Sequence, residues 1–355
     1  MTVTITKPEI NLRDELSAVK SPTGVFGEQL GRADTVTDFY NLTGQNKNLV
    51  INGDFKVSQR GNFTAGVTNA AATPAIYMDR WFTRPYGSDS QTVTHGSVVL
   101  PDGTYTQTMK VQQTGTVNNT PFYHMSYPME IERWMVNKTF TVSYWYRTNT
   151  PRIRARYCNT LECFANLGED MIADEQWHYN SWQMRIPTNA TIGSLAQIHP
   201  AFTKADGANI LGGEYFEFTL VQCELGTVAT PFEFRHYTTE LLLCQRYCYV
   251  IDGPASGDRI GSAFIFSSTG GIITIPLPVQ MRVAPSLVGT PSSVTLNDSI
   301  AGYTQSTAVT INGAGKHFVS LAFTSSGMTA GRGAQAYFSG AGDNRIIFTA
   351  EFATV

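Results

Sequence analysis

The chain has 355 residues and a formal net charge of −3, and only 15% of its residues are charged. Hydrophobic residues reach 42% and aromatic residues 12%, which is enough to bury a sizeable core and excludes intrinsic disorder. A weakly acidic chain has no broad basic surface, so we expect no nucleic-acid partner. No apolar run reaches the roughly 18 residues of a membrane span, so we expect no membrane insertion.

The first segment, residues 1–47, lacks a regular apolar pattern beyond one short helix predicted over Asn11–Lys20. Several of its residues are too apolar for a solvated tail: Leu16, Val19, Phe26, Leu30, Phe39 and Tyr40. We interpret the segment as an extended N-terminal arm that becomes ordered only when it docks on another protein surface. The alternative is a plain disordered leader.

Residues 48–238 predict a β-sandwich, because short alternating stretches are separated by regular turn signals such as Asn52-Gly53. The strand predicted over residues 138–147 places four side chains on its inward face: Phe140, Val142, Tyr144 and Tyr146. Trp145 lies on the opposite face. A second strand, over residues 214–221, places three side chains inward: Phe216, Phe218 and Leu220.

One helix is predicted over Thr239–Val250, inside a joining segment of residues 239–252, because this stretch contains no Gly or Pro. Leu241, Cys244 and Cys248 fall on one stripe of that helix, so we expect it to pack as a rigid joint. Residues 253–355 predict a second, smaller β domain. The predicted fold class is therefore all-β, with two β domains, one joining helix and an N-terminal arm.

Residues that could carry catalysis or bind zinc are scattered. The six histidines do not pair with cysteine at zinc spacing, and no nucleophile or phosphate-loop motif is present. The five cysteines are an odd number, so we expect buried free thiols rather than a disulfide framework. These observations predict a protein that is not an enzyme and needs no cofactor.

Two stretches of the chain carry a family signature. The first reads NLVINGDFKVSQRG over residues 48–61 and continues with YMDRWF over 77–82. The second reads QCELGTVATPFEFR over residues 222–235 and continues with CQRY over 244–247. Together they resemble a family of tailed-bacteriophage virion proteins that includes tail-fibre-like, appendage and head-decorating proteins.

This resemblance implies a jelly-roll sandwich in a structural virion protein that is assembled in the bacterial host cytoplasm. The first expectation is a tail fibre or appendage that presents a receptor- or carbohydrate-binding surface for host attachment. The alternative is a head-decorating or capsid-stabilising protein anchored by its arm to other virion subunits. An enzymatic rival, a polysaccharide-cleaving tailspike, needs two carboxylates across a groove and is less favoured. The resemblance also implies a homotrimer, and the low charge suits broad interfaces.

Exposed aromatic residues would be needed to stack on a host glycan, and the candidates are Trp145, Tyr123 and Trp177. The first motif is also similar to the opening turn of carbohydrate-binding jelly-roll modules, several of which hold calcium there. That similarity implies a weak calcium site with Asn52, Asp54 and Glu217, although Lys56 stands where the modules often have an acid. The competing interpretation is that Asn52 and Asp54 satisfy the turn.

Asp79 and Arg80 are adjacent, so on a strand they would face opposite ways. We expect Trp81 to lie in the core. We expect Arg80 to pair with a carboxylate such as that of Glu224 or Glu233.

Overall fold

The structure is a computed structural model. It describes residues 47–69, 75–83, 90–116, 125–158, 163–204, 208–253, 255–289, 294–298, 302–339 and 344–352. The predicted docking residues of the arm and the glycan candidate Tyr123 lie outside the described residues.

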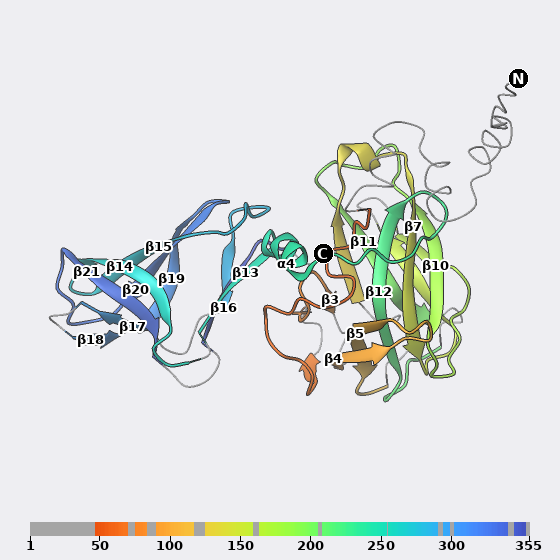
Figure 1. The fold of residues 1–355 in the computed structure, drawn as a ribbon, viewed down its shortest axis with the longest axis horizontal. Helices are drawn as coiled ribbons and strands as arrows, with labels where there is room; N and C mark the ends of the chain where they lie inside the picture. The colour runs from red at the N-terminus through yellow and green to blue at the C-terminus, as the bar shows by residue number, and fades with distance from the viewer. Residues whose placement is uncertain are drawn as a thin grey trace, which may run out of the picture.

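Two six-stranded antiparallel sheets pack face to face and form a jelly-roll β-sandwich (Figure 1). The first sheet has the order β1 (Val67–Asn69), β4 (Gln91–Val99), β5 (Tyr105–Gln113), β12 (Tyr215–Leu225), β7 (Thr139–Thr148) and β10 (His178–Arg185). The second has the order β2 (Ala75–Ile76), β3 (Phe82–Thr83), β6 (Met125–Glu130), β11 (Leu195–Lys204), β8 (Ile153–Cys158) and β9 (Cys163–Leu167). A short 3-10 helix, η1 (Arg133–Met135), precedes β7.

The sandwich core lies between the two sheets. All four predicted inward residues of β7 are buried in it, as is Trp81. On β12 the prediction is right for Phe216 and Phe218 and wrong for Leu220. The register with β7 shifts there, and Leu220 adopts a left-handed φ of 51°. This β-bulge moves Leu220 to the outward face, and Val221 takes the next core position.

The C-terminal part forms a second β domain of two antiparallel sheets around its own core. The larger sheet has the order β18 (Tyr303–Gln305), β17 (Val294–Asn297), β21 (Arg332–Phe338), β14 (Arg259–Ser267), β15 (Gly270–Pro276), β20 (Phe318–Thr324) and β19 (Ala308–Ala314). The smaller sheet has the order β13 (Cys248–Asp252), β22 (Arg345–Thr349) and β16 (Ser286–Gly289). The predicted all-β class is confirmed.

Helix α4 (Tyr237–Gln245) connects the two domains, and it is the single α-helix in the described part of the chain (Figure 1). It is shorter than predicted, because residues 248–252 pair with β22 as strand β13. The predicted stripe is therefore wrong. Glu240 and Cys244 are the buried residues of the helix, Leu241 is half-buried, and Cys248 belongs to β13. No described helix has the length and apolar character needed to cross a membrane.

Buried charges fasten the second domain to the sandwich beside α4. Arg80 is 1% exposed and pairs with Glu351, not with the predicted Glu224 or Glu233. Its guanidinium also lies 3.5 Å from the ring centre of Tyr247. Arg60 pairs with Asp79 at 3.0 Å and approaches Glu351 at 3.7 Å. Burial raises the pKa of the Asp79 carboxyl, while the charge of Arg60 opposes that shift.

The expectation of free buried thiols is confirmed for Cys223, Cys244 and Cys248. It is wrong for Cys158, which is disulfide-bonded. Cys158 is the last residue of β8, and the backbone register of the β8–β9 pair places it opposite Cys163.

Candidate functional site

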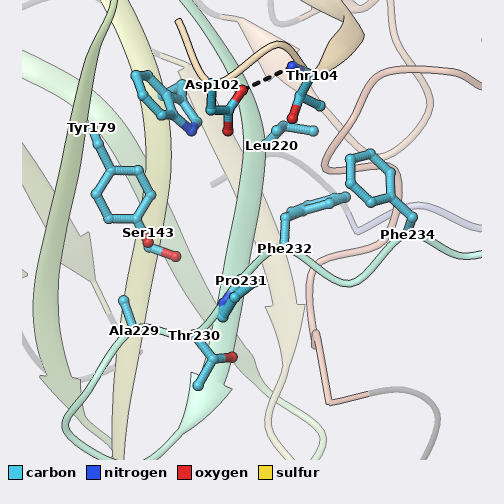
Figure 2. Close-up of a pocket in the computed structure, with 11 residues that line it drawn as sticks. Asp102, Thr104, Ser143, Tyr179, Leu220, Ala229, Thr230, Pro231, Phe232 and Phe234 are labelled. Atoms are coloured by element: carbon cyan, nitrogen blue, oxygen red, sulfur yellow. Dashed lines mark hydrogen bonds between the residues drawn. The ribbon is translucent and has the colours of Figure 1, made fainter. Parts of the chain in front are cut away.

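A groove of about 380 Å³ opens on the outward face of the sheet that contains β7, β10 and β12 (Figure 2). It is lined by Asp102, Thr104, Ser143, Trp145, Tyr179, Leu220, Ala229, Thr230, Pro231, Phe232 and Phe234. These residues come from β7, β10, β12, the β4–β5 turn and the segment after β12. The volume is in the range of small-molecule sites, roughly 300–1,000 Å³.

One wall of the groove is an aromatic pair. Trp145 on β7 and Tyr179 on β10 are direct cross-strand partners, with ring centres 5.7 Å apart. Both residues point outward, because their neighbours in sequence alternate into the core. Trp145 is half-buried and Tyr179 is 49% exposed. The predicted outward orientation of Trp145 therefore agrees with the structure, and its ring has an aromatic neighbour that supports it.

The opposite wall comes from the segment after β12. Phe232 and Phe234 pack edge to face with ring centres 4.9 Å apart, and Phe234 is 57% exposed. Behind this wall, Gly53 approaches the backbone of β12 closely, since a Cβ at Gly53 would lie 2.1 Å from the Val221 carbonyl oxygen. A side chain at Gly53 would therefore clash with β12.

Two buried side chains of β12 hold that segment in place. The Glu224 carboxylate accepts hydrogen bonds from the Thr230 N–H and hydroxyl, both at 2.6 Å. The Gln222 amide donates to the Thr230 carbonyl at 3.1 Å and accepts from the Glu233 N–H at 2.9 Å. Both residues are at most 1% exposed. The wall of the groove is therefore positioned before any ligand arrives.

Polar groups at the groove can bind a hydroxylated ligand. Asp102 lies at the rim, and its carboxylate accepts the Thr104 N–H at 2.9 Å. The Ser143 side chain lies beside the Tyr179 hydroxyl (Figure 2). Burial raises the pKa of Tyr179, so its hydroxyl stays protonated at neutral pH and can donate a hydrogen bond. Asp102 is the single charged residue in the lining as far as the structure describes it.

The other predicted glycan residue, Trp177, lies outside this lining. Its ring lies 5.2 Å from the guanidinium of Arg147, which is two residues after Trp145 on the same face of β7. Arg147 in turn pairs with Glu217 at 2.5 Å. Trp177 therefore belongs to a cation–π contact next to the groove.

The three predicted calcium residues each have protein partners. The Asn52 side chain bonds both the N–H and the carbonyl of Val57, at 2.9 and 2.8 Å, and Asp54 pairs with Lys56 at 2.7 Å. Glu217 accepts from Thr108 and pairs with Arg147. Among the described residues no group of three or more His, Cys, Asp and Glu side chains could hold a metal ion. The bonds of Asn52 to Val57 agree with the interpretation that this side chain satisfies the turn. A calcium ion at this position stays a prediction.

Of the residues that line the groove, sequence reasoning named Trp145 alone, and it missed the three other aromatic residues, Tyr179, Phe232 and Phe234. The outward position of Tyr179 could have been predicted from the alternation of side chains along residues 178–185. Trp182 and Met184 are buried in the core, so residue 179 lies on the outward face of β10. Phe232 and Phe234 belong to the family signature over residues 222–235, which does not by itself assign them a role. Nothing in the sequence indicates that their segment folds back beside Trp145.

No protein-family model matches the chain, and no curated protein matches it. Among solved structures, it resembles a CBM4 structure at 15% identity and a TM-score of 0.28, over 50% of this chain and 99% of that one. It also resembles the enzymatically active domain of bacteriophage CBA120 tailspike protein 4, at 14% identity and a TM-score of 0.30, over 50% of this chain and 21% of that one. The baseplate tripod of bacteriophage Tuc2009 matches at 14% identity and a TM-score of 0.29, over 79% of this chain and 90% of that one. TM-scores this low establish neither a family nor a function.

Proposed function

We propose that this chain is a non-enzymatic virion protein of a tailed bacteriophage, and that it binds carbohydrate through the groove at Trp145. The aromatic groove is the observation that carries the binding proposal. The virion assignment rests on the signature over residues 48–61 and 222–235. A groove of this kind supports the role of a tail fibre or appendage, which presents a binding surface to the host cell.

Sugar rings have apolar C–H faces and hydroxyl edges, and the groove offers a partner for each. Trp145 and Tyr179 form an aromatic wall, and Phe232 and Phe234 form the wall across from it. Ser143, Tyr179 and Asp102 provide hydroxyl and carboxylate groups for hydrogen bonds. Preformed apolar sites with a few placed polar groups are typical of small-ligand binding.

The charge of the lining residues indicates which class of sugar the groove would bind. Asp102 is the single charged residue among the described residues of the lining, and Glu224 lies buried behind the wall. The nearby Arg147 is paired with Glu217, so an acidic sugar would meet the Asp102 carboxylate without an unpaired cation beside it, which is unfavourable. We therefore expect neutral or amino sugars rather than sialylated or phosphorylated ones. The described lining residues include one carboxylate, whereas a glycosidase uses a pair, which supports the proposal of a binding protein.

The test is calorimetric titration of the purified chain with neutral, amino and sialylated oligosaccharides. Trp145→Ala should weaken binding of the neutral or amino sugar at least tenfold, which corresponds to about 1.4 kcal/mol. Tyr237→Ala is the matched control, since Tyr237 is 51% exposed and lies outside the groove. Equal affinity of Trp145→Ala and the wild type would refute the groove as the binding site.

A further inference from the structure

A second cavity, of about 660 Å³, lies at the junction of the two domains. Phe63, Ile76 and Tyr77 line it from the sandwich. Val288 on β16 and Ile347 on β22 line it from the small sheet of the second domain. This is the outward face of that sheet, because the residues on either side of Ile347 along β22 belong to the domain core. Small-ligand sites occur preferentially at domain interfaces and enclose roughly 300–1,000 Å³, so the junction cavity has the place and the size of such a site.

The walls of the junction cavity are mostly apolar and partly open to solvent. Phe63 and Tyr77 pack edge to face, with ring centres 5.3 Å apart. Ile76 and Ile347 are half-buried, and Val288 is 67% exposed. A ligand that covers these side chains removes apolar surface from water, which favours a molecule with an apolar body.

Two charged residues, Arg60 and Glu351, line the same cavity, and each has an ion-pair partner. Arg60 Nη1 donates to Asp79 Oδ1 at 3.0 Å, and Glu351 Oε2 accepts from Arg80 Nη1. Glu351 Oε1 is buried and has no hydrogen-bond partner in the described part of the chain. It lies 3.7 Å from Arg60 Nη2, which is too far for a direct hydrogen bond. A single oxygen placed beside both groups could bond to each of them.

We propose that the junction cavity binds a small neutral molecule that has an apolar ring body and one hydroxyl group. The ligand hydroxyl donates its hydrogen to Glu351 Oε1, and its oxygen accepts from Arg60 Nη2. The ring body lies against the apolar walls. A charged ligand is disfavoured, because burying an ion without a counter-ion is costly and both lining charges are already paired. The described lining residues of this cavity and of the groove at Trp145 do not overlap, so the two sites are separate.

Equilibrium dialysis of the full chain against the fluorescent probe 2-naphthol tests the proposal. We expect saturable binding of one molecule per chain at neutral pH. The comparison probe is 2-fluoronaphthalene, which has nearly the same shape and no hydroxyl, and it should bind about tenfold more weakly because it cannot donate to Glu351. Apolar contact alone would favour 2-fluoronaphthalene, the more hydrophobic of the two. Equal or tighter binding of 2-fluoronaphthalene would therefore overturn the proposal.

Substitutions at exposed positions of the lining locate the bound probe. Val288→Asp places a charge at the rim of the cavity and should weaken 2-naphthol binding about tenfold. Val99→Asp is the matched control, since Val99 is 61% exposed on β4 and lies outside the cavity lining. Ser286→Trp fills part of the cavity from another exposed position and keeps the test decisive if Val288→Asp alters folding, as judged by circular dichroism. Absence of saturable binding to the wild type, or wild-type affinity in either folded variant, would overturn the proposal.

Discussion

Buried polar residues, rather than apolar ones alone, position the groove. The Glu224 carboxylate and the Gln222 amide lie on the outward face of β12 and bind the backbone of residues 230–233. Buried polar groups stabilise a structure only when their hydrogen bonds are satisfied. Gln222 and Glu224, the buried polar residues of the signature motif, are therefore explained by the hydrogen bonds that hold this segment in place.

The three free thiols should make the chain sensitive to alkaline pH. Burial raises the pKa of Cys223, Cys244 and Cys248 above the ordinary value of 9.0. Above about pH 9 the thiols of the unfolded chain lose protons that the folded chain keeps, so the free energy of unfolding falls as pH rises. Cys223→Ala should make that fall shallower in urea titrations between pH 8 and 10.

The same thiols should be unreactive in the native protein, because the thiolate is the reactive form. Ellman's reagent at pH 8 should label them slowly in buffer and fully in urea. Fast stoichiometric labelling in buffer would contradict the buried positions.

At the scale of elements, a network of buried ion pairs joins the two domains beside α4. Arg60, Asp79, Arg80 and Glu351 are two positive and two negative groups with little exposure. Glu351→Gln removes one negative charge and leaves the Arg80 guanidinium buried without its ion pair. Breaking a buried pair from one side costs about 3–5 kcal/mol.

We expect Glu351→Gln to loosen the C-terminal domain while both domains stay folded. Limited proteolysis should then cleave near α4, and thermal unfolding should separate into two transitions. Asp170→Asn is the control, because Asp170 and Arg154 form an exposed pair, and such pairs contribute about 0–1 kcal/mol. If the two variants give the same digestion pattern, the network does not hold the joint.

At the scale of the whole molecule, Asn48 joins the first described residues to the rest of the sandwich. The side chain of Asn48 donates to the Val221 carbonyl at 3.1 Å and accepts from the Cys223 N–H at 3.0 Å. Its backbone N–H also donates to Glu233 at 2.8 Å. These bonds join the start of the sandwich to β12 and to the groove segment.

Two truncations test these bonds and the docking role of the arm. Deleting residues 1–46 should leave the free energy of unfolding within about 0.5 kcal/mol of the full chain and abolish incorporation into virions. Deleting residues 1–48 should also destabilise the sandwich by about 1–3 kcal/mol for each buried group left unpaired. Urea unfolding followed by tryptophan fluorescence measures the first effect, and loading onto particles measures the second. Wild-type loading of the shorter deletion would mean that the arm does not dock.

The sequence by itself determined the all-β class, the inward face of β7 and the outward position of Trp145. These features follow from the alternation of side chains along a strand, which is a local property. Only the tertiary structure decided the partner of Arg80, since Glu351 lies 271 residues away and local spacing does not select it. It also decided the bulge that moves Leu220 outward and the return of residues 229–234 beside Trp145, because both depend on how distant backbones pair.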